Sequence, residues 1–172
     1  MPLDVAVDRG AVWEEGDRHW AAWCMKAATA ALRGAGLGRL VEMDAEIAIR
    51  LADDKEVRAL NAQYRGKDRP TNVLSFPQLT PGEITSHEPC EQEILLGDLI
   101  LARETVVREA SEKSVPLEHH VAHLIVHGTL HLMGYDHQDD ASADAMEQLE
   151  RTVLAELGID DPYASADGVG EE

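Results

Sequence analysis

The segment HGTLHLMGYDH, residues 127–137, carries three histidines whose spacing could hold a metal ion. His127 and His131 are four residues apart, so on a helix both imidazoles lie on one face and can approach one ion. Gly134 is suited to end that helix in the left-handed conformation, which would turn the chain back and bring in His137. Three imidazole ligands leave one tetrahedral position for water, which is typical of a catalytic zinc site. The alternative interpretation is an ordinary helix whose histidines only pack and cap.

Two kinds of neighbouring residue restrict the metal hypothesis. His123 extends the histidine stripe, but His123 and His131 are eight positions apart, which is about 12 Å along a helix, while zinc–nitrogen bonds are only about 2 Å long. We therefore expect His123 to support the ligands or to lie in the core, and His119 and His120 to lie on the surface. The spacing also matches that of metzincin peptidases, but Gly128 stands where they carry a glutamate. Peptide hydrolysis would lack its usual proton shuttle.

A basic turn is the second candidate for chemistry. The segment NAQYRGKDRPTNVLSFP, residues 61–77, places Arg65, Lys67 and Arg69 around a turn before a short apolar run. A guanidinium offers a fixed fork of donors to phosphate oxygens, and a lysine adds a point charge. The net charge of −18 argues against nucleic acid, but salt screens charges that are more than about 8–10 Å apart, so a local basic patch can still bind phosphate. The alternative is a solvated basic turn.

The elements that must position these residues follow from hydrophobic periodicity. Strands come early and helices cluster late, which predicts an α+β fold with a small mixed sheet covered by helices and a metal site at the end of a histidine-bearing helix. A length of 172 residues predicts one domain, residues 1–158, and an acidic, disordered tail, residues 159–172. The expected strands are residues 3–8, 45–53, 73–76 and 93–102, and the expected helices lie within residues 14–36, 53–65, 103–113, 117–133 and 140–157.

Composition limits the cellular context. Cys24 and Cys90 form no CxxC pair, so we expect neither a disulfide framework nor a thiolate zinc site, and a reducing cytoplasm is the default location. The first residues carry no basic segment followed by an apolar run, and no uninterrupted apolar stretch reaches the ~18 residues that a membrane span needs. We therefore expect a cytoplasmic protein with no membrane partner.

Three motifs together resemble a known family. HGTLHLMGYDH, YRGKDRPTNVLSFP and LLGDLIL occur in the order found in the bacterial endoribonuclease YbeY family of rRNA maturation factors, and the resemblance spans about residues 45–157. Asn72 is a departure, because the family is expected to carry aspartate there. The resemblance implies a zincin-like α+β fold and a zinc-dependent, single-strand-specific endoribonuclease. Such an enzyme would act in 16S rRNA 3′-end maturation and ribosome quality control, with the ribosome or ribosomal proteins as partners and no role for DNA.

The resemblance also implies roles for individual residues. His127, His131 and His137 would hold one zinc ion per chain, and Arg65 would be the catalytic residue. This assignment agrees with the chemistry, because zinc can activate water and polarise a phosphoryl oxygen, and a guanidinium can stabilise the charge that develops on phosphorus.

Further candidates surround these residues. Lys67 and Arg69 are expected to bind substrate, and Asp136 and His123 are expected to orient the metal ligands without binding the metal. The alternative for Asp136 is that it caps the turn. Three alternatives of other classes stay open: a zinc metallopeptidase-like hydrolase, a phosphatase or other small-substrate hydrolase, and a non-catalytic ribosome-binding zinc module. The last would need a fourth protein ligand, for which Cys90 is the available cysteine.

Overall fold

A mixed sheet of four strands forms the centre of the protein. The computed structural model describes residues 4–9, 20–42, 45–79, 94–135 and 139–163. The strand order is β1-β2-β4-β3, with β2 parallel to β1 and to β4, and β3 antiparallel to β4. The apolar run predicted as an inner strand, β4, has a neighbour on each side. The strands are β1 (Asp4–Arg9), β2 (Ala45–Ala52), β3 (Val73–Pro77) and β4 (Ile94–Ala102).

The two faces of the sheet differ in burial because side chains alternate along each strand. In β2, Ile47, Ile49 and Leu51 are buried on one face, whereas Arg50 on the other face is partly exposed. Leu99 of β4 shares the buried face, since it is the register partner of Ile49. One face of the sheet therefore belongs to the main core, and the other is only partly covered.

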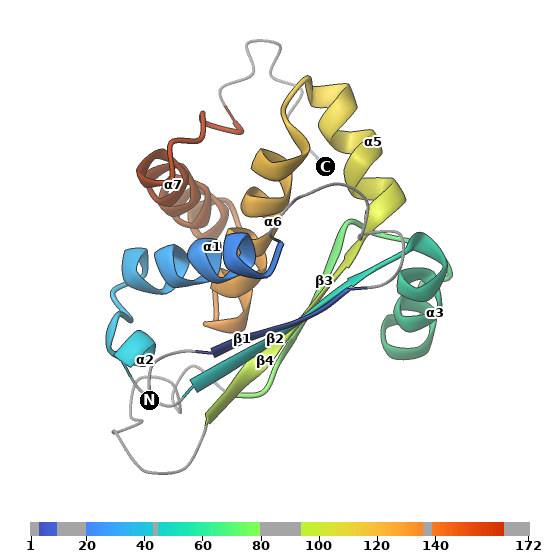
Figure 1. Cartoon of the computed structure of the whole chain (residues 1–172), viewed down its shortest axis with the longest axis horizontal. Coiled ribbons are helices and arrows are strands. Elements are labelled where there is room, and N and C mark those ends of the chain that lie inside the picture. Colours follow the sequence, from blue (N-terminus) through green and yellow to red (C-terminus); the bar gives the residue numbers. More distant parts are fainter. Residues whose placement is uncertain (1–3, 10–19, 43–44, 80–93, 136–138, 164–172) are drawn as a thin grey trace.

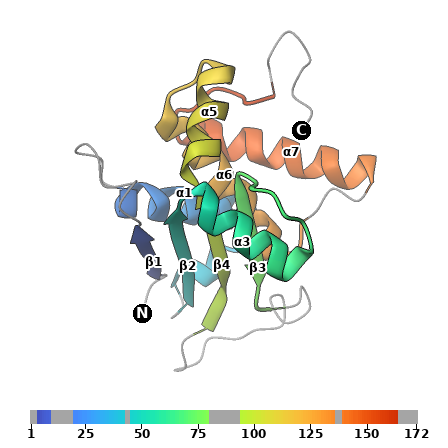
Figure 2. The same ribbon diagram turned by 90° about the vertical axis from the view of Figure 1, so that its right-hand side faces the viewer.

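Helices cover the two faces unequally. Helices α1 and α6 pack on the buried face and α7 packs on them, whereas α3 lies across the opposite face, in front of β4 and β3 in Figure 2. Helix α5 follows β4 directly and packs against α6 (Figure 1). The helices are α1 (Trp20–Gly34), α2 (Arg39–Glu42), α3 (Asp54–Arg65), α5 (Arg103–Lys113), α6 (Leu117–Leu132) and α7 (Asp140–Glu156).

The elements agree with the predicted α+β fold to within a residue or two at most ends, because the hydrophobic periods were clear. The short helix α2 was not predicted, since four residues between glycine-rich and acidic segments carry too little periodicity. Residues 14–19 of the first predicted helix lie outside the described residues, and the helix is described from Trp20.

The segment predicted as a tail begins with residues that pack against the domain. Ile159 is only 7% exposed and belongs to the main core cluster, and the hydroxyl of Tyr163 hydrogen-bonds Glu150. The part of the predicted tail that the structure describes, residues 159–163, is therefore packed against the domain. A single apolar residue and a single tyrosine in an acidic segment gave no periodic signal, although both are anchored. Residues 164–172 lie outside the described part.

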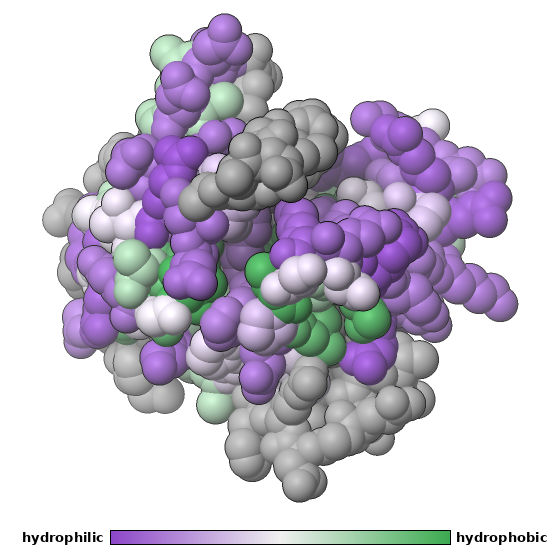
Figure 3. All heavy atoms as spheres, turned by 90° about the horizontal axis from the view of Figure 1, so that it is seen from above, coloured by the Kyte–Doolittle hydropathy of each residue, from purple (hydrophilic) through white to green (hydrophobic). Residues whose placement is uncertain are grey.

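Hydrophilic residues dominate the outer surface seen from above in Figure 3, and hydrophobic ones show in small areas near its middle. Within the described residues, no helix is long and apolar enough to cross a membrane.

Candidate active site

Helix α6 brings His127 and His131 to the wall of a cavity. The two residues lie one turn apart, and their ring centroids are 4.7 Å from each other. The sequence of α6 is apolar around the histidines, and most of the helix is therefore buried. Both imidazoles line a cavity of about 470 Å³ whose other walls include Arg65, residues of β3 and Tyr135. The structure thus places the predicted histidine pair and the predicted arginine around one space.

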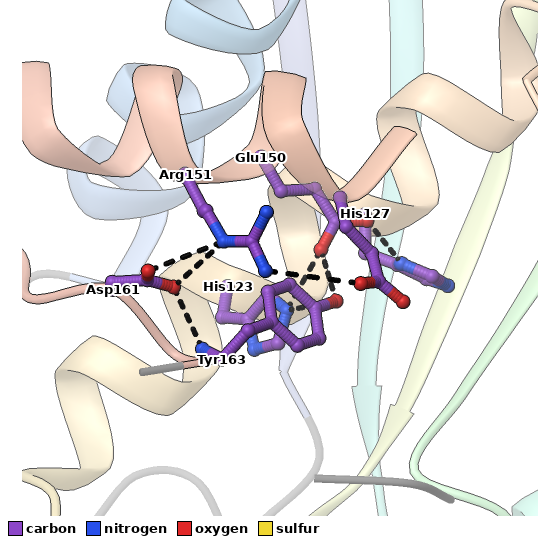
Figure 4. Close-up of polar contacts among 7 residues, drawn as sticks. His123, His127, Glu150, Arg151, Asp161 and Tyr163 are labelled. Carbon is purple, nitrogen blue, oxygen red and sulfur yellow. Dashed lines mark hydrogen bonds and ion pairs between the residues drawn. The ribbon is translucent and has the colours of Figure 1, made fainter. Parts of the chain in front are cut away.

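A carboxylate from α7 lies behind His127. Oε2 of Glu150 is 2.6 Å from Nδ1 of His127, and the Glu150 side chain is fully buried (Figure 4). An ionised carboxylate can only accept, so Nδ1 of His127 must carry the proton and donate it. In the neutral imidazole, the second ring nitrogen, Nε2, then carries a lone pair. Metal-binding histidines are commonly oriented in this way by a carboxylate on their far nitrogen.

The other oxygen of Glu150 is also used. Oε1 lies 3.0 Å from Nε2 of His123, and it accepts a hydrogen bond from the Tyr163 hydroxyl (Figure 4). Burial alone would raise the pKa of Glu150, but the hydrogen bonds from His123 and His127 outweigh burial, so this pKa lies well below its usual value. Burial lowers the pKa of His123 despite the contact with Glu150. Glu150 therefore stays ionised, and its two oxygens accept hydrogen bonds from His123 and His127.

Arg65 ends α3 and lies across from the histidines. Its Nη2 donates a hydrogen bond of 2.8 Å to the carbonyl oxygen of Ser75 in β3, and its guanidinium carbon lies 5.6 Å from the centre of the Phe76 ring. The helix ends here because Gly66 adopts a left-handed conformation with φ of 70°. One end of the guanidinium is thus fixed on β3 at the cavity wall.

The basic turn after Arg65 is held by Asn61, which sequence reasoning did not select. Asn61 is 3% exposed, and its Nδ2 donates to the carbonyl oxygen of Arg69 over 2.8 Å. The backbone carbonyl oxygen of Asn61 accepts a hydrogen bond from the backbone N–H of Lys67. Lys67 and Arg69 line a second cavity, of about 690 Å³, which shares Arg65 with the first. An asparagine inside a helix has no local signal for such a role.

Arg58, a fourth base near this turn, points elsewhere. Its guanidinium donates two hydrogen bonds to the Asp68 carboxylate, over 2.8 and 3.2 Å. The hydrogen bond from Arg58 lowers the pKa of Asp68. Arg58 does not line either cavity around the histidines.

Asn72 belongs to a second polar cluster beside the cavities. Its Nδ2 donates to Glu109 Oε1 over 3.1 Å, and Nε2 of His120 lies 2.8 Å from the same oxygen. Burial would raise the pKa of Glu109, but the hydrogen bonds from His120 and Asn72 outweigh it and lower this pKa. His120 was predicted on the surface and is 2% exposed, because Glu109 of α5, itself partly buried, provides a hydrogen-bond partner. An aspartate at position 72 would face Glu109 with a second negative charge.

Gly128 is packed against the sheet. A Cβ atom built on Gly128 would lie 2.7 Å from Cδ2 of Leu99, a fully buried residue of β4. A side chain at this position would meet the core, so the glutamate of a metzincin peptidase does not fit here without displacing Leu99. This contact disfavours the peptidase alternative.

The predicted ligands are only partly described. His127 and His131 lie together, whereas His137, Asp136 and Cys90 fall outside the described residues. Within the described ranges, no group of three histidine, cysteine or acidic side chains is placed to hold a metal. His123 contacts Oε1 of Glu150 and does not line the 470 Å³ cavity that His127 and His131 share. The three-histidine ligand set stays a prediction.

Comparison with known proteins identifies the family. The family model described as endoribonuclease YbeY matches residues 14–158. The chain is 53% identical to endoribonuclease YbeY of Rhizorhabdus wittichii, over 94% of this chain and 97% of that one, and 50% identical to its namesake from Sphingopyxis alaskensis, over 96% and 99%. It shares its fold with the solution structure of TM1509 from Thermotoga maritima, with a TM-score of 0.57, 22% identity, and coverage of 99% and 95%. This chain belongs to the endoribonuclease YbeY family.

Proposed function

We propose that the protein is a zinc-dependent endoribonuclease that cleaves single-stranded RNA in the cytoplasm, during maturation of the 16S rRNA 3′ end and in ribosome quality control. Family membership makes the chain an endoribonuclease, a hydrolase acting on RNA. The observation that carries the metal-dependent part is the pairing of His127 with the buried Glu150, across one cavity from Arg65. The histidine-bearing α6 packed on β3 and β4 supports a zincin-like arrangement.

The residues present suit a zinc ion. His127, His131 and His137 would hold it, and the donor set of neutral imidazoles with a carboxylate behind one of them is the set that zinc favours. When bound, zinc supplies Lewis acidity and makes water a nucleophile at neutral pH. Glu150 keeps His127 in the tautomer that has a lone pair on Nε2.

Arg65 would stabilise the negative charge that develops on the phosphoryl oxygens. Because the Ser75 carbonyl already fixes one Nη atom, the guanidinium needs little reorganisation before it donates its other N–H groups to a phosphate. The Phe76 ring supports the guanidinium from one side. Arg65 lines both cavities, so it stands where the substrate would pass from one to the other.

The larger cavity suggests the path of the RNA. Its rim carries five basic residues and two acidic ones, although the chain has a net charge of −18. Two of the bases, Arg108 and Lys113, come from α5, and sequence reasoning did not connect them with the basic turn. Both are exposed, and Arg108 makes a long contact of 3.9 Å to Glu112. We include Arg108 and Lys113 in the RNA-binding surface, together with Lys67 and Arg69.

Replacing both Arg108 and Lys113 with alanine should weaken binding of single-stranded RNA. Each lost phosphate contact removes about 0.7 from the slope of log affinity against log salt, so the double variant should have a slope that is smaller by about 1.4. Fluorescence anisotropy of a labelled single-stranded RNA at several salt concentrations measures this slope.

A matched control exists in Arg33 and Lys55. Arg33 also makes a contact of 3.9 Å to a glutamate and is as exposed as Arg108, and neither residue lines the two cavities. The double alanine variant at Arg33 and Lys55 removes the same charge from elsewhere and should keep the slope. Equal slopes for the two double variants would show that Arg108 and Lys113 of α5 do not contact the RNA.

Cleavage of matched substrates tests the proposed function itself. We expect the purified protein to cut a single-stranded RNA from the 3′ end of 16S rRNA, and to leave the same sequence intact as a duplex or as DNA. A zinc chelator should stop the reaction, and added zinc should restore it. Cleavage that survives complete removal of the metal would contradict the zinc-dependent part, and cleavage of DNA at the same rate would contradict the substrate.

A further inference from the structure

The segment after α7 reaches back to the candidate active site. Ile159 anchors it in the core, and Tyr163 lies over the side chains of His123 and Glu150 (Figure 4). The tyrosine hydroxyl donates to Oε1 of Glu150, and Oε2 of the same carboxylate accepts from His127. One carboxylate therefore links the C-terminal segment with a predicted zinc ligand.

The aromatic ring of Tyr163 is held on two sides. The guanidinium carbon of Arg151 lies 5.2 Å from the ring centre, and the ring of His123 meets it edge-on at 5.5 Å. Arg151 also pairs with Asp161 at 3.2 Å, and Asp161 accepts the N–H of Tyr163 over 2.8 Å. These contacts hold the ring of Tyr163 in place without the hydroxyl. The role of the hydroxyl can therefore be tested separately from that of the ring.

That role concerns the orientation of Glu150. The carboxylate is fully buried, and an ionised carboxylate needs several donors to offset the loss of water. Oε1 receives the Tyr163 hydroxyl and faces Nε2 of His123, while Oε2 receives His127. Removing the hydroxyl takes one donor from Oε1 and leaves it facing His123, so the carboxylate can rotate away from His127 more easily.

We propose that Tyr163 is a positioning residue of the active site, which locks the Glu150 carboxylate so that His127 presents Nε2 to the zinc ion. The described segment after α7, residues 159–163, then supports the active site through Tyr163. This inference rests on the proposed function, because it takes His127 as a zinc ligand. The Tyr163 hydroxyl acts on His127 through Glu150, and the same hydroxyl also lies 3.2 Å from Nε2 of His123.

Tyr163→Phe tests the hydroxyl, because the ring contacts with Arg151 and with the His123 ring can remain, while the hydroxyl contacts with Glu150 and with Nε2 of His123 are lost. Outer partners of zinc ligands typically contribute 10–100-fold in metal affinity, so we expect about 10-fold weaker zinc binding for Tyr163→Phe and about 100-fold for Glu150→Gln. Competition with a chromophoric chelator measures both. Tyr64→Phe, at an exposed tyrosine of α3, removes the same hydroxyl elsewhere and should leave zinc binding unchanged.

A purely structural role would lower the melting temperature of the zinc-free protein in step with zinc affinity. We expect Tyr163→Phe to shift that temperature little, and to lower kcat more than it raises KM for RNA. Zinc affinity within twofold of the wild type in Tyr163→Phe would overturn the role of the hydroxyl, and the same result in Glu150→Gln would overturn the whole linkage.

The tautomer of His127 gives a readout that needs neither zinc nor activity. In a two-bond proton–nitrogen spectrum of the zinc-free protein, His127 should carry its proton on Nδ1, and the population of the other tautomer should grow in Tyr163→Phe. The same single tautomer in both proteins would contradict the proposal. A wild-type protein that binds no zinc and cuts no RNA would instead contradict the proposed function, and the tautomer result would still stand.

Discussion

Replacing Arg65 with alanine is expected to slow cleavage of single-stranded RNA by about 10²–10³-fold, which corresponds to about 3–4 kcal/mol of lost transition-state stabilisation. The guanidinium is anchored on the Ser75 carbonyl at the wall of the histidine cavity, so it can meet the developing charge without rearranging. Zinc content and the melting temperature should stay close to those of the wild type, because Arg65 is exposed and the Ser75 residue whose carbonyl loses a donor is only partly buried. Single-turnover cleavage of a labelled RNA measures the rate.

Arg58→Ala is the matched control for this experiment. Arg58 lies on the same helix and carries the same charge, but its guanidinium is bound to Asp68 and lines neither cavity. We expect this variant to cleave RNA nearly as fast as the wild type. If Arg65→Ala also cleaved at the wild-type rate, Arg65 would be an ordinary solvated residue of a basic turn.

The second large effect is expected on zinc. The wild type should bind one zinc ion per chain, and His131→Ala and His137→Ala should each retain almost none after dialysis, because two imidazoles and water hold zinc poorly. His119→Ala, on the same helix but outside both cavities, should keep its zinc. Metal analysis of the purified variants decides the ligand set. Full zinc content in His137→Ala would remove His137 from it.

His127→Ala should differ from His131→Ala in one measurable respect. Both variants should lose zinc, but the loss of His127 also leaves Oε2 of the buried Glu150 without its donor. A buried acceptor without a partner costs about 1–3 kcal/mol, so the zinc-free His127→Ala protein should unfold at a lower denaturant concentration than the zinc-free His131→Ala protein. Equal midpoints would show that Glu150 finds another donor.

Local sequence patterns predicted the part of the site that lies within single elements. His127 and His131 lie one turn apart on one helix, and their spacing alone predicted that their imidazoles lie close together. The turn that carries Lys67 and Arg69 was readable from its charges and its glycine and proline. The third predicted ligand, His137, lies outside the described residues and stays a prediction.

Contacts between distant elements could not be predicted in the same way. Glu150 is separated from His127 by 23 residues and sits in an acidic stretch, where it looks like any solvated glutamate. Its burial depends on how α7 packs against α6, which periodicity does not specify. The pairing of His120 with Glu109 of α5 and the anchoring of Tyr163 depend on tertiary packing in the same way.

Strand β3 is an edge strand of the sheet, and an edge strand can promote self-association. The outermost strand of a sheet offers unpaired backbone groups that can template pairing with another chain. The N–H of Ala102 in β4 pairs with the carbonyl of Asn72, so alternate residues, Val73, Ser75 and Pro77, turn their backbone groups outward. Asn72 Oδ1 accepts the N–H of Val73, Arg65 donates to the carbonyl of Ser75, and Pro77 has no N–H to offer. Arg65, the arginine proposed for catalysis, therefore also occupies a carbonyl group that an added strand would need at this edge of the sheet.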